Sequence, residues 1–212
     1  MNAIKLSLVE DETEFQEWLL EEINESPDLH CISQHYDGIE ALQMIPRVQP
    51  DIVLMDLSLK NSRIDGLECI LRLKSGMPQL KILVISAHID EQRIFKALSY
   101  GAGAYIHKAQ IHRKLPALIR EFYAGGAPMS PGIAQKIIKA FRKTKEQLKK
   151  IERLSPKERE VLELLAQGKL YKEVADEMNI SINTMKRHAH NIYQKLQVNN
   201  LTEALRIYHP HK

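Results

Sequence analysis

The sequence predicts a chain of two parts, an N-terminal α/β domain with a doubly wound parallel sheet and a smaller all-α domain that follows it. Three observations predict this division. Short apolar runs alternate with helical patterns as far as Tyr123, strand signals are absent after Leu154, and the charge of the chain changes sign between the two parts. A chain of 212 residues is long enough for two modest domains.

The first part has the pattern of five strand–helix units. We expect strands at residues 4–9, 30–36, 51–56, 81–86 and 104–107, and helices near 13–25, 38–46, 66–74, 91–100 and 112–123. Five such units favour a (βα)5, flavodoxin-like sheet with helices on both faces. Gly125, Gly126 and Pro128 then break the pattern, so we place this domain at residues 1–125.

Residues 126–150 are expected to form a basic and largely helical linker, and residues 151–212 an all-α domain of four helices. The segment Ser155–Glu158 has the pattern of a capping box with proline in the first turn, and Gly168 is expected to end that helix. A short helix over 172–178 follows.

Asn179 can adopt the left-handed conformation of a tight turn, and Ser181 is expected to cap a longer helix that ends near Leu196. A last helix is expected to begin near Thr202. Two helices joined by a tight turn within a small helical domain indicate a helix-turn-helix.

The distribution of charge supports a nucleic-acid partner. Residues 1–130 hold 13 Lys and Arg against 18 Asp and Glu, whereas residues 131–212 hold 17 against 9. A basic module joined to an acidic one is typical of proteins with a separate nucleic-acid-binding part. No apolar run approaches the length of a membrane span, so we expect no membrane partner and a cytoplasmic location.

Carboxylates follow two of the expected strands. Asp56 ends the apolar run that begins at residue 51, and Glu10 and Asp11 end the first strand. Because the carboxyl ends of parallel strands meet at one edge of a sheet, three carboxylates would repel one another there unless a divalent cation binds. Ser86 and Lys108 follow two later strands. Together these groups predict a phosphoryl-transfer pocket.

Four fragments of this part resemble the receiver domains of two-component response regulators. They are Val9–Asp11, Leu54–Asp56, Ile85–Ala87 and Gly103–Lys108. The resemblance implies that Asp56 accepts a phosphoryl group from a sensor histidine kinase. It also implies a Mg²⁺ site, with ligands from Glu10, Asp11, Asp56 and the backbone carbonyl of Ser58.

The same resemblance gives three further residues a role. Lys108 would pair with Asp56 and then with the phosphoryl oxygens, Ser86 would donate a hydrogen bond to those oxygens, and Tyr105 would report the state of the site to the outer face. The loop between Asp56 and Asp65 departs from the family pattern, because it is two residues longer and has Lys60 where proline is usual.

The third helix of the second part has an apolar face and a polar face. The polar side chains are of the kinds that contact phosphates and base edges. They are Asn183, Lys186, Arg187, His190, Asn191 and Gln194.

The segment from Leu154 to Ala204 resembles the LuxR-type helix-turn-helix, and with a receiver before it the chain resembles the NarL/FixJ family. The matching text includes Ser155–Leu162, Ser181–His188 and Ile192–Leu196. Positions Tyr171, Gln197 and Asn200 depart from the usual pattern, where Asn, Gly and Arg are typical.

The resemblance implies roles for three groups of residues. Double-stranded promoter DNA would be contacted at base edges by Lys186, Arg187 and His190 and at phosphates by Thr184 and Lys172. The last helix, with Leu201, Ala204 and Leu205, corresponds to the element through which such proteins form homodimers when active.

Two other functions are alternatives to this one. An aspartyl-phosphate hydrolase of the haloacid dehalogenase type needs a carboxylate two residues after the nucleophile, where this chain has Ser58. We therefore expect a phosphoacceptor and not an enzyme with turnover. A receiver that acts only as a protein-interaction module, insensitive to phosphorylation, stays open because of the altered loop.

Overall fold

The computed structural model describes residues 3–208, and the chain divides into two compact units. The first unit ends at Ile137 and the second begins at Ile138.

The first unit is built on a five-stranded sheet in the order β2-β1-β3-β4-β5, in which all neighbouring strands run parallel. Its strands are β1 (Ile4–Val9), β2 (Leu29–His35), β3 (Ile52–Met55), β4 (Lys81–Ser86) and β5 (Ala104–His107). The doubly wound fold expected from the sequence is confirmed, and each strand begins and ends within one residue of its expected limits.

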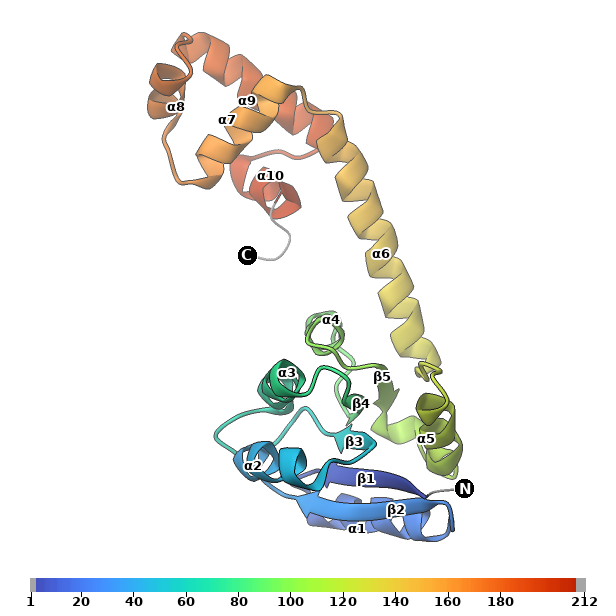
Figure 1. Cartoon of the computed structure of the whole chain (residues 1–212). Helices are drawn as coiled ribbons and strands as arrows, with labels where there is room; N and C mark the ends of the chain where they lie inside the picture. Colours follow the sequence, from blue (N-terminus) through green and yellow to red (C-terminus); the bar gives the residue numbers. More distant parts are fainter. Residues whose placement is uncertain (1–2, 209–212) are drawn as a thin grey trace. The chain divides into compact units, whose positions relative to one another are not determined.

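Helices cover both faces of this sheet (Figure 1). They are α1 (Thr13–Asn24), α2 (Gly38–Val48), α3 (Gly66–Gly76), α4 (Glu91–Ser99), the 3₁₀ helix η1 (Lys108–Gln110) and α5 (Leu115–Tyr123). One apolar cluster joins α2, α3 and α4 to the sheet, and a second joins α1 and α5 to its other face. Both faces of β3, β4 and β5 are therefore buried, as their continuous apolar runs require, whereas the edge strand β2 is partly exposed.

The helix boundaries of this unit differ from the expected ones by one to three residues, most at the start of α5. Helix α5 begins at Leu115 instead of residue 112, because η1 forms first and Arg113 has a left-handed φ of 56° that no α-helix accommodates. Helix α2 continues past Pro46 to Val48, so the proline lies inside its last turn.

A long helix, α6 (Pro131–Glu152), begins in the first unit and ends in the second. Ile133, in its first turn, is 1% exposed and belongs to the cluster of α2, α3 and α4. Ile138, Phe141 and Leu148 are exposed.

The second unit contains four further helices around one apolar core. They are α7 (Pro156–Ala166), α8 (Tyr171–Glu177), α9 (Ile182–Leu196) and α10 (Leu201–Tyr208). The capping box of Ser155 and Glu158 is present, and Ser181 caps α9 by accepting from the Thr184 N–H. Gly168 and Asn179 have left-handed φ values of 87° and 52° in the turns that flank α8.

Within residues 3–208, none of the helices combines the length and the apolar character needed to cross a membrane.

Candidate phosphoacceptor site and DNA-binding helix

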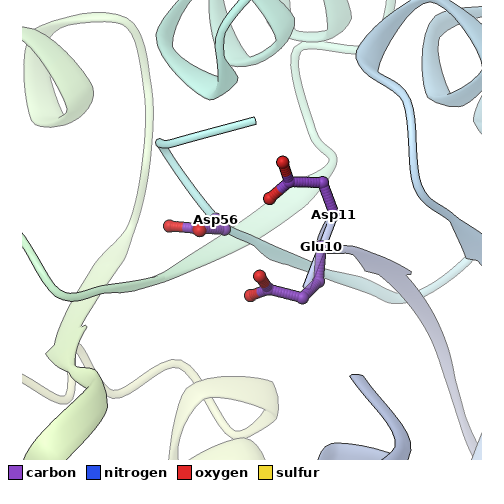
Figure 2. A group of neighbouring side chains, drawn as sticks. All are labelled: Glu10, Asp11 and Asp56. Carbon is purple, nitrogen blue, oxygen red and sulfur yellow. The ribbon is translucent and has the colours of Figure 1, made fainter. Parts of the chain in front are cut away.

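Three carboxylates gather at the carboxyl edge of the sheet, as Figure 2 shows. Glu10 and Asp11 follow β1, Asp56 follows β3, and one oxygen of each lies within 4.8 Å of the others. Glu10 and Asp56 are only 2% and 5% exposed, whereas Asp11 is half-buried. The hydrogen-bonded pairing of β1 with β3 places these side chains together.

Lys108 neutralises part of this charge from the end of β5. Its Nζ lies 2.7 Å from Glu10 Oε2 and 3.1 Å from Asp56 Oδ2, and it stands 4.3 Å from the centre of the Phe15 ring. Burial alone lowers the pKa of Lys108, but the hydrogen bond to Glu10 and the charge of Asp56 together raise it above its usual value. The lysine therefore stays protonated.

One ammonium cannot balance two buried carboxylates and a third beside them. Burial, and then the negative charge of Asp56, raises the pKa of Glu10 from 4.5 to about 7, although Lys108 opposes this change. The site thus carries an excess of negative charge at a cost in free energy. A bound divalent cation would remove that cost.

The oxygen atoms of the site are suited to such a cation. Asp56 Oδ1 is buried and accepts no hydrogen bond from any of the described residues, so it is available to a metal ion or to an incoming phosphoryl group. Asp11 Oδ2 accepts from the backbone N–H of Asn61 at 3.2 Å. Carboxylate oxygens are the protein ligands that Mg²⁺ prefers. Ser58 is half-buried in the loop after Asp56, and its carbonyl as a further ligand stays a prediction.

Ser86 and Tyr105 are both fully buried, and both contact the backbone of His88. The Ser86 hydroxyl accepts from the His88 N–H at 3.2 Å, and the Tyr105 hydroxyl donates to the His88 carbonyl at 2.8 Å. Burial raises the pKa of Tyr105 to about 12, so the phenol keeps its proton and remains a donor. The two residues are thus joined through the backbone of a single residue, His88, a link that no sequence pattern indicated.

The predicted DNA-contacting residues lie on α8 and α9. Lys186, Arg187 and His190 are exposed on α9, and Lys172 is exposed on α8. Thr184 is half-buried, and its hydroxyl lies 2.9 Å from that of Ser181 at the helix cap. The residues expected to reach base edges are therefore accessible, whereas Thr184 first serves the cap.

Tyr171, which departs from the family pattern, has a hydrogen-bond partner in the structure. The Tyr171 hydroxyl lies 2.6 Å from the Tyr193 hydroxyl, so this pair ties α8 to the C-terminal half of α9. The sequence showed the substitution but not the partner, which lies 22 positions away.

One of the three residues predicted for dimerisation needs correction. Ala204 is completely buried in the core of its own domain, so its side chain offers no surface to a second protomer. Leu201 and Leu205 flank it on α10 and are partly exposed. The alanine faces inward because the helical period brings every third or fourth residue onto the buried stripe.

A charged phosphoacceptor edge on a doubly wound sheet, followed by a helix-turn-helix, defines a class of DNA-binding regulators controlled by phosphorylation. The family model of the response regulator receiver domain matches residues 6–120, and that of the luxR family of bacterial regulatory proteins matches residues 152–208. The chain belongs to the two-component response regulators, in the NarL/FixJ family. It is a phosphoacceptor transcription regulator and not an enzyme with turnover.

Relatives of known role match almost the whole chain. The response regulator protein VraR of Staphylococcus epidermidis is 28% identical over 203 residues, which cover 96% of this chain and 95% of that protein. VraR of Staphylococcus aureus is also 28% identical over the same length.

Solved structures share the fold. The RcsB response regulator of Salmonella typhimurium has a TM-score of 0.63 at 22% identity and covers 98% of both chains. A LuxR-family response regulator from Aurantimonas sp. SI85-9A1 has a TM-score of 0.61 at 28% identity, over 66% of this chain and 98% of that one. RcsB has been solved as two dimers bound to two parallel DNAs, and bound to a promoter with the phosphomimetic beryllofluoride.

Proposed function

We propose that Asp56 accepts a phosphoryl group from a sensor histidine kinase in the cytoplasm and that this modification controls the binding of promoter DNA. The observation that supports this most directly is the buried Oδ1 of Asp56, which lies beside the Lys108 ammonium and has no hydrogen-bond partner among residues 3–208. Most buried side-chain oxygens in proteins have a hydrogen-bond partner, so an exception at the end of a strand points to a chemical role.

The proposed transfer uses groups that already surround Asp56. A carboxylate oxygen of Asp56 attacks the phosphorus of the kinase phosphohistidine, the P–N bond breaks, and the imidazole takes up a proton. Mg²⁺, held by Glu10, Asp11 and Asp56 with the Ser58 carbonyl, would neutralise the phosphoryl oxygens. Lys108 is within hydrogen-bonding distance of Asp56 and can pair with the same oxygens.

The new charge is proposed to be sensed by Ser86. If Ser86 moves so that its hydroxyl donates to a phosphoryl oxygen at Asp56, its contact with the His88 N–H changes with it, and the His88 carbonyl holds the Tyr105 hydroxyl. The change at the site would thereby reach the buried aromatic of β5. A local charge then acts on an element that can adopt two arrangements.

DNA binding is proposed to place α9 in the major groove, with Lys186, Arg187 and His190 near base edges. Lys172 is proposed to contact phosphate, and Thr184 to do so from the helix cap. The net positive charge of residues 131–212 favours this partner. Homodimerisation through Leu201 and Leu205 of α10 would bring two such helices to adjacent half-sites, and RcsB is likewise a dimer on DNA.

Labelling by a small phosphodonor tests the acceptor. Acetyl phosphate with Mg²⁺ is expected to phosphorylate Asp56, and Asp56→Asn is expected to abolish the label in mass spectrometry. Asp11→Ala should weaken Mg²⁺ binding, whereas Lys108→Ala should retain the metal and impair the response to phosphorylation. Equal phosphorylation of the Asn variant would refute the assignment of Asp56.

A further inference from the structure

The loop after Asp56, residues 57–65, has defined attachments despite its additional length. Asn61 donates its backbone N–H to Asp11 Oδ2 at 3.2 Å. The Ser62 hydroxyl accepts from the N–H of Gly38 at 3.0 Å and from the N–H of Ile64 at 3.3 Å. One residue of the loop thus holds a carboxylate of the acidic site, and the next is fixed to the start of α2.

The attachment to α2 is close-packed. A Cβ atom at Gly38 would lie 2.6 Å from Cys69 Sγ, 2.8 Å from Ile64 Cγ1 and 3.2 Å from Ser62 Oγ. Such distances leave no room for a side chain, so the loop packs directly on the backbone at this position. The anchor of Ser62 is therefore a rigid element.

The three carboxylates are oriented from two sides. Lys108 holds Glu10 and Asp56, and the loop holds Asp11. We propose that Ser62 is a positioning residue for Mg²⁺: it fixes the loop so that the Asn61 N–H keeps Asp11 turned toward the other two carboxylates. This inference rests on the proposed metal site, and it assigns a role to the segment in which the chain departs from its family.

Isothermal titration calorimetry of Mg²⁺ binding to the full-length chain tests the role of Ser62. Ser62→Ala is expected to lower the affinity about fivefold, the factor that corresponds to one hydrogen bond of ordinary net strength. Ser62→Thr should restore it, because the hydroxyl returns. Asn61→Ala should bind like wild type, because only the backbone of that residue donates.

Ser75→Ala is the matched control, since its hydroxyl bonds to Leu71 on an exposed face of α3. If wild type binds no Mg²⁺, the proposed function itself fails. If wild type binds Mg²⁺ and Ser62→Ala binds it equally well, the positioning role is wrong.

A second inference comes from different contacts, on the outer edge of β5. Tyr105 donates its N–H to the Pro128 carbonyl at 3.3 Å, and Ser130 donates its N–H to the Tyr105 carbonyl at 3.2 Å. Met129 forms a parallel bridge with Tyr105. The N–H of His107 donates to the Ser130 hydroxyl at 2.9 Å, and Ser130 is 5% exposed. The segment before α6 therefore pairs with the strand that ends next to Lys108.

The first turns of α6 are also packed against the receiver. Ile133 is buried in the same apolar cluster as Tyr105, Ile94 and Ala97, and Ile137 packs against that cluster one turn later. A change in the position of Tyr105 or of β5 cannot leave these contacts unaltered, because close-packed side chains transmit displacements.

We infer that Pro128 to Ile137 is the output element of the receiver, through which the phosphorylated state of Asp56 reaches α6. This deepens the proposed function, since it names the route by which Tyr105 acts on the chain beyond the receiver. The route runs within one protomer and requires no second copy.

Hydrogen exchange of the α6 amides in the full-length chain, with and without beryllofluoride and Mg²⁺, tests this route. In wild type the ligand is expected to change exchange in α6. Ile133→Ala should reduce that change at least threefold. Ile138→Ala should respond like wild type, because it removes the same atoms from an exposed position on the same helix.

Fluorine NMR of bound beryllofluoride distinguishes loss of coupling from loss of the site. The inference requires that Ile133→Ala still binds the ligand. If that variant does not fold, Ser130→Ala, which removes only the hydrogen bond to His107, decides the outcome. A wild-type exchange response in the folded variants would show that the signal leaves the receiver elsewhere.

Discussion

Replacing Glu10 with Gln is expected to stabilise the receiver at neutral pH in the absence of divalent cations. The folded protein raises the pKa of Glu10 from 4.5 to about 7, first by burial and then through the charge of Asp56. Between these two values the folded chain keeps a proton that the unfolded chain has released. The contribution of Glu10 to stability is therefore most favourable below pH 4.5 and is lost as the pH rises to 7.

The interval from 4.5 to about 7 corresponds to roughly 3 kcal/mol, at about 1.4 kcal/mol for each pKa unit. The wild-type receiver should lose about this much between pH 5 and pH 8 relative to Glu10→Gln, whose amide does not ionise. Mg²⁺ should recover most of the loss, and more at pH 8 than at pH 6, because it binds the ionised carboxylate.

Urea unfolding of the full-length chain, followed by the fluorescence of Trp18, measures this difference in stability, because Trp18 reports on the unfolding of the receiver and not of the second unit. Trp18 is the single tryptophan of the chain, and it lies in α1 stacked on Phe15 at 5.4 Å between ring centres. The titrations are run in EDTA at several pH values. Parallel stability curves for wild type and Glu10→Gln would contradict this prediction, because they would show that Glu10 ionises as easily in the folded protein as in the unfolded chain.

Two further predictions concern the DNA-binding domain. Arg187→Ala should cost about 1–3 kcal/mol in binding a selected site and relax the preference at one base pair, whereas Lys172→Ala should weaken all sequences alike and reduce the salt dependence by about one unit. Binding isotherms on selected and scrambled duplexes at several salt concentrations separate the two, and an unchanged Arg187→Ala would place recognition elsewhere. Lys195→Met should destabilise the domain by about 1–3 kcal/mol, because its Nζ lies 2.6 Å from the buried Glu158 Oε2. Burial raises the pKa of Glu158, but the bonds from Lys195 and Ser155 lower it overall, so this stability is present above pH 4.5 and lost in acid. Calorimetry of wild type and Lys195→Met at pH 7 and pH 4 measures this stability. Equal transition temperatures of the two proteins at pH 7 would contradict the role of the pair.

Local patterns in the sequence predicted most of the helices and strands correctly. All five strands were located to within a residue. The apolar runs of β3, β4 and β5 are continuous because strands buried on both faces must be apolar throughout, whereas the edge strand β2 is partly exposed and mixes polar with apolar residues. Ser155, Gly168 and Ser181 marked helix ends correctly, since capping is decided by the few residues around it. The convergence of Glu10 and Asp56 followed from the topology alone.

Contacts between segments far apart in the sequence could not be predicted from such local patterns. The Asn61 N–H reaches Asp11 across 50 positions, and it acts through the backbone, which leaves no trace in residue type. The pairing of Met129 with Tyr105 adds a single bridge to an edge strand, too short for any alternation to show. The inward position of Ala204 was missed because a resemblance carries over a role without the packing of the particular helix.

Whether modification of Asp56 controls DNA binding is tested most directly by the affinity of the full-length chain for a selected promoter fragment. Binding is measured with and without beryllofluoride and Mg²⁺, for wild type and for Asp56→Asn. A change in wild-type affinity that the Asn variant lacks is the predicted result. Wild-type affinity that stays the same, while fluorine NMR shows beryllofluoride bound at the site, would contradict the claim and leave a receiver that serves only as a protein-interaction module.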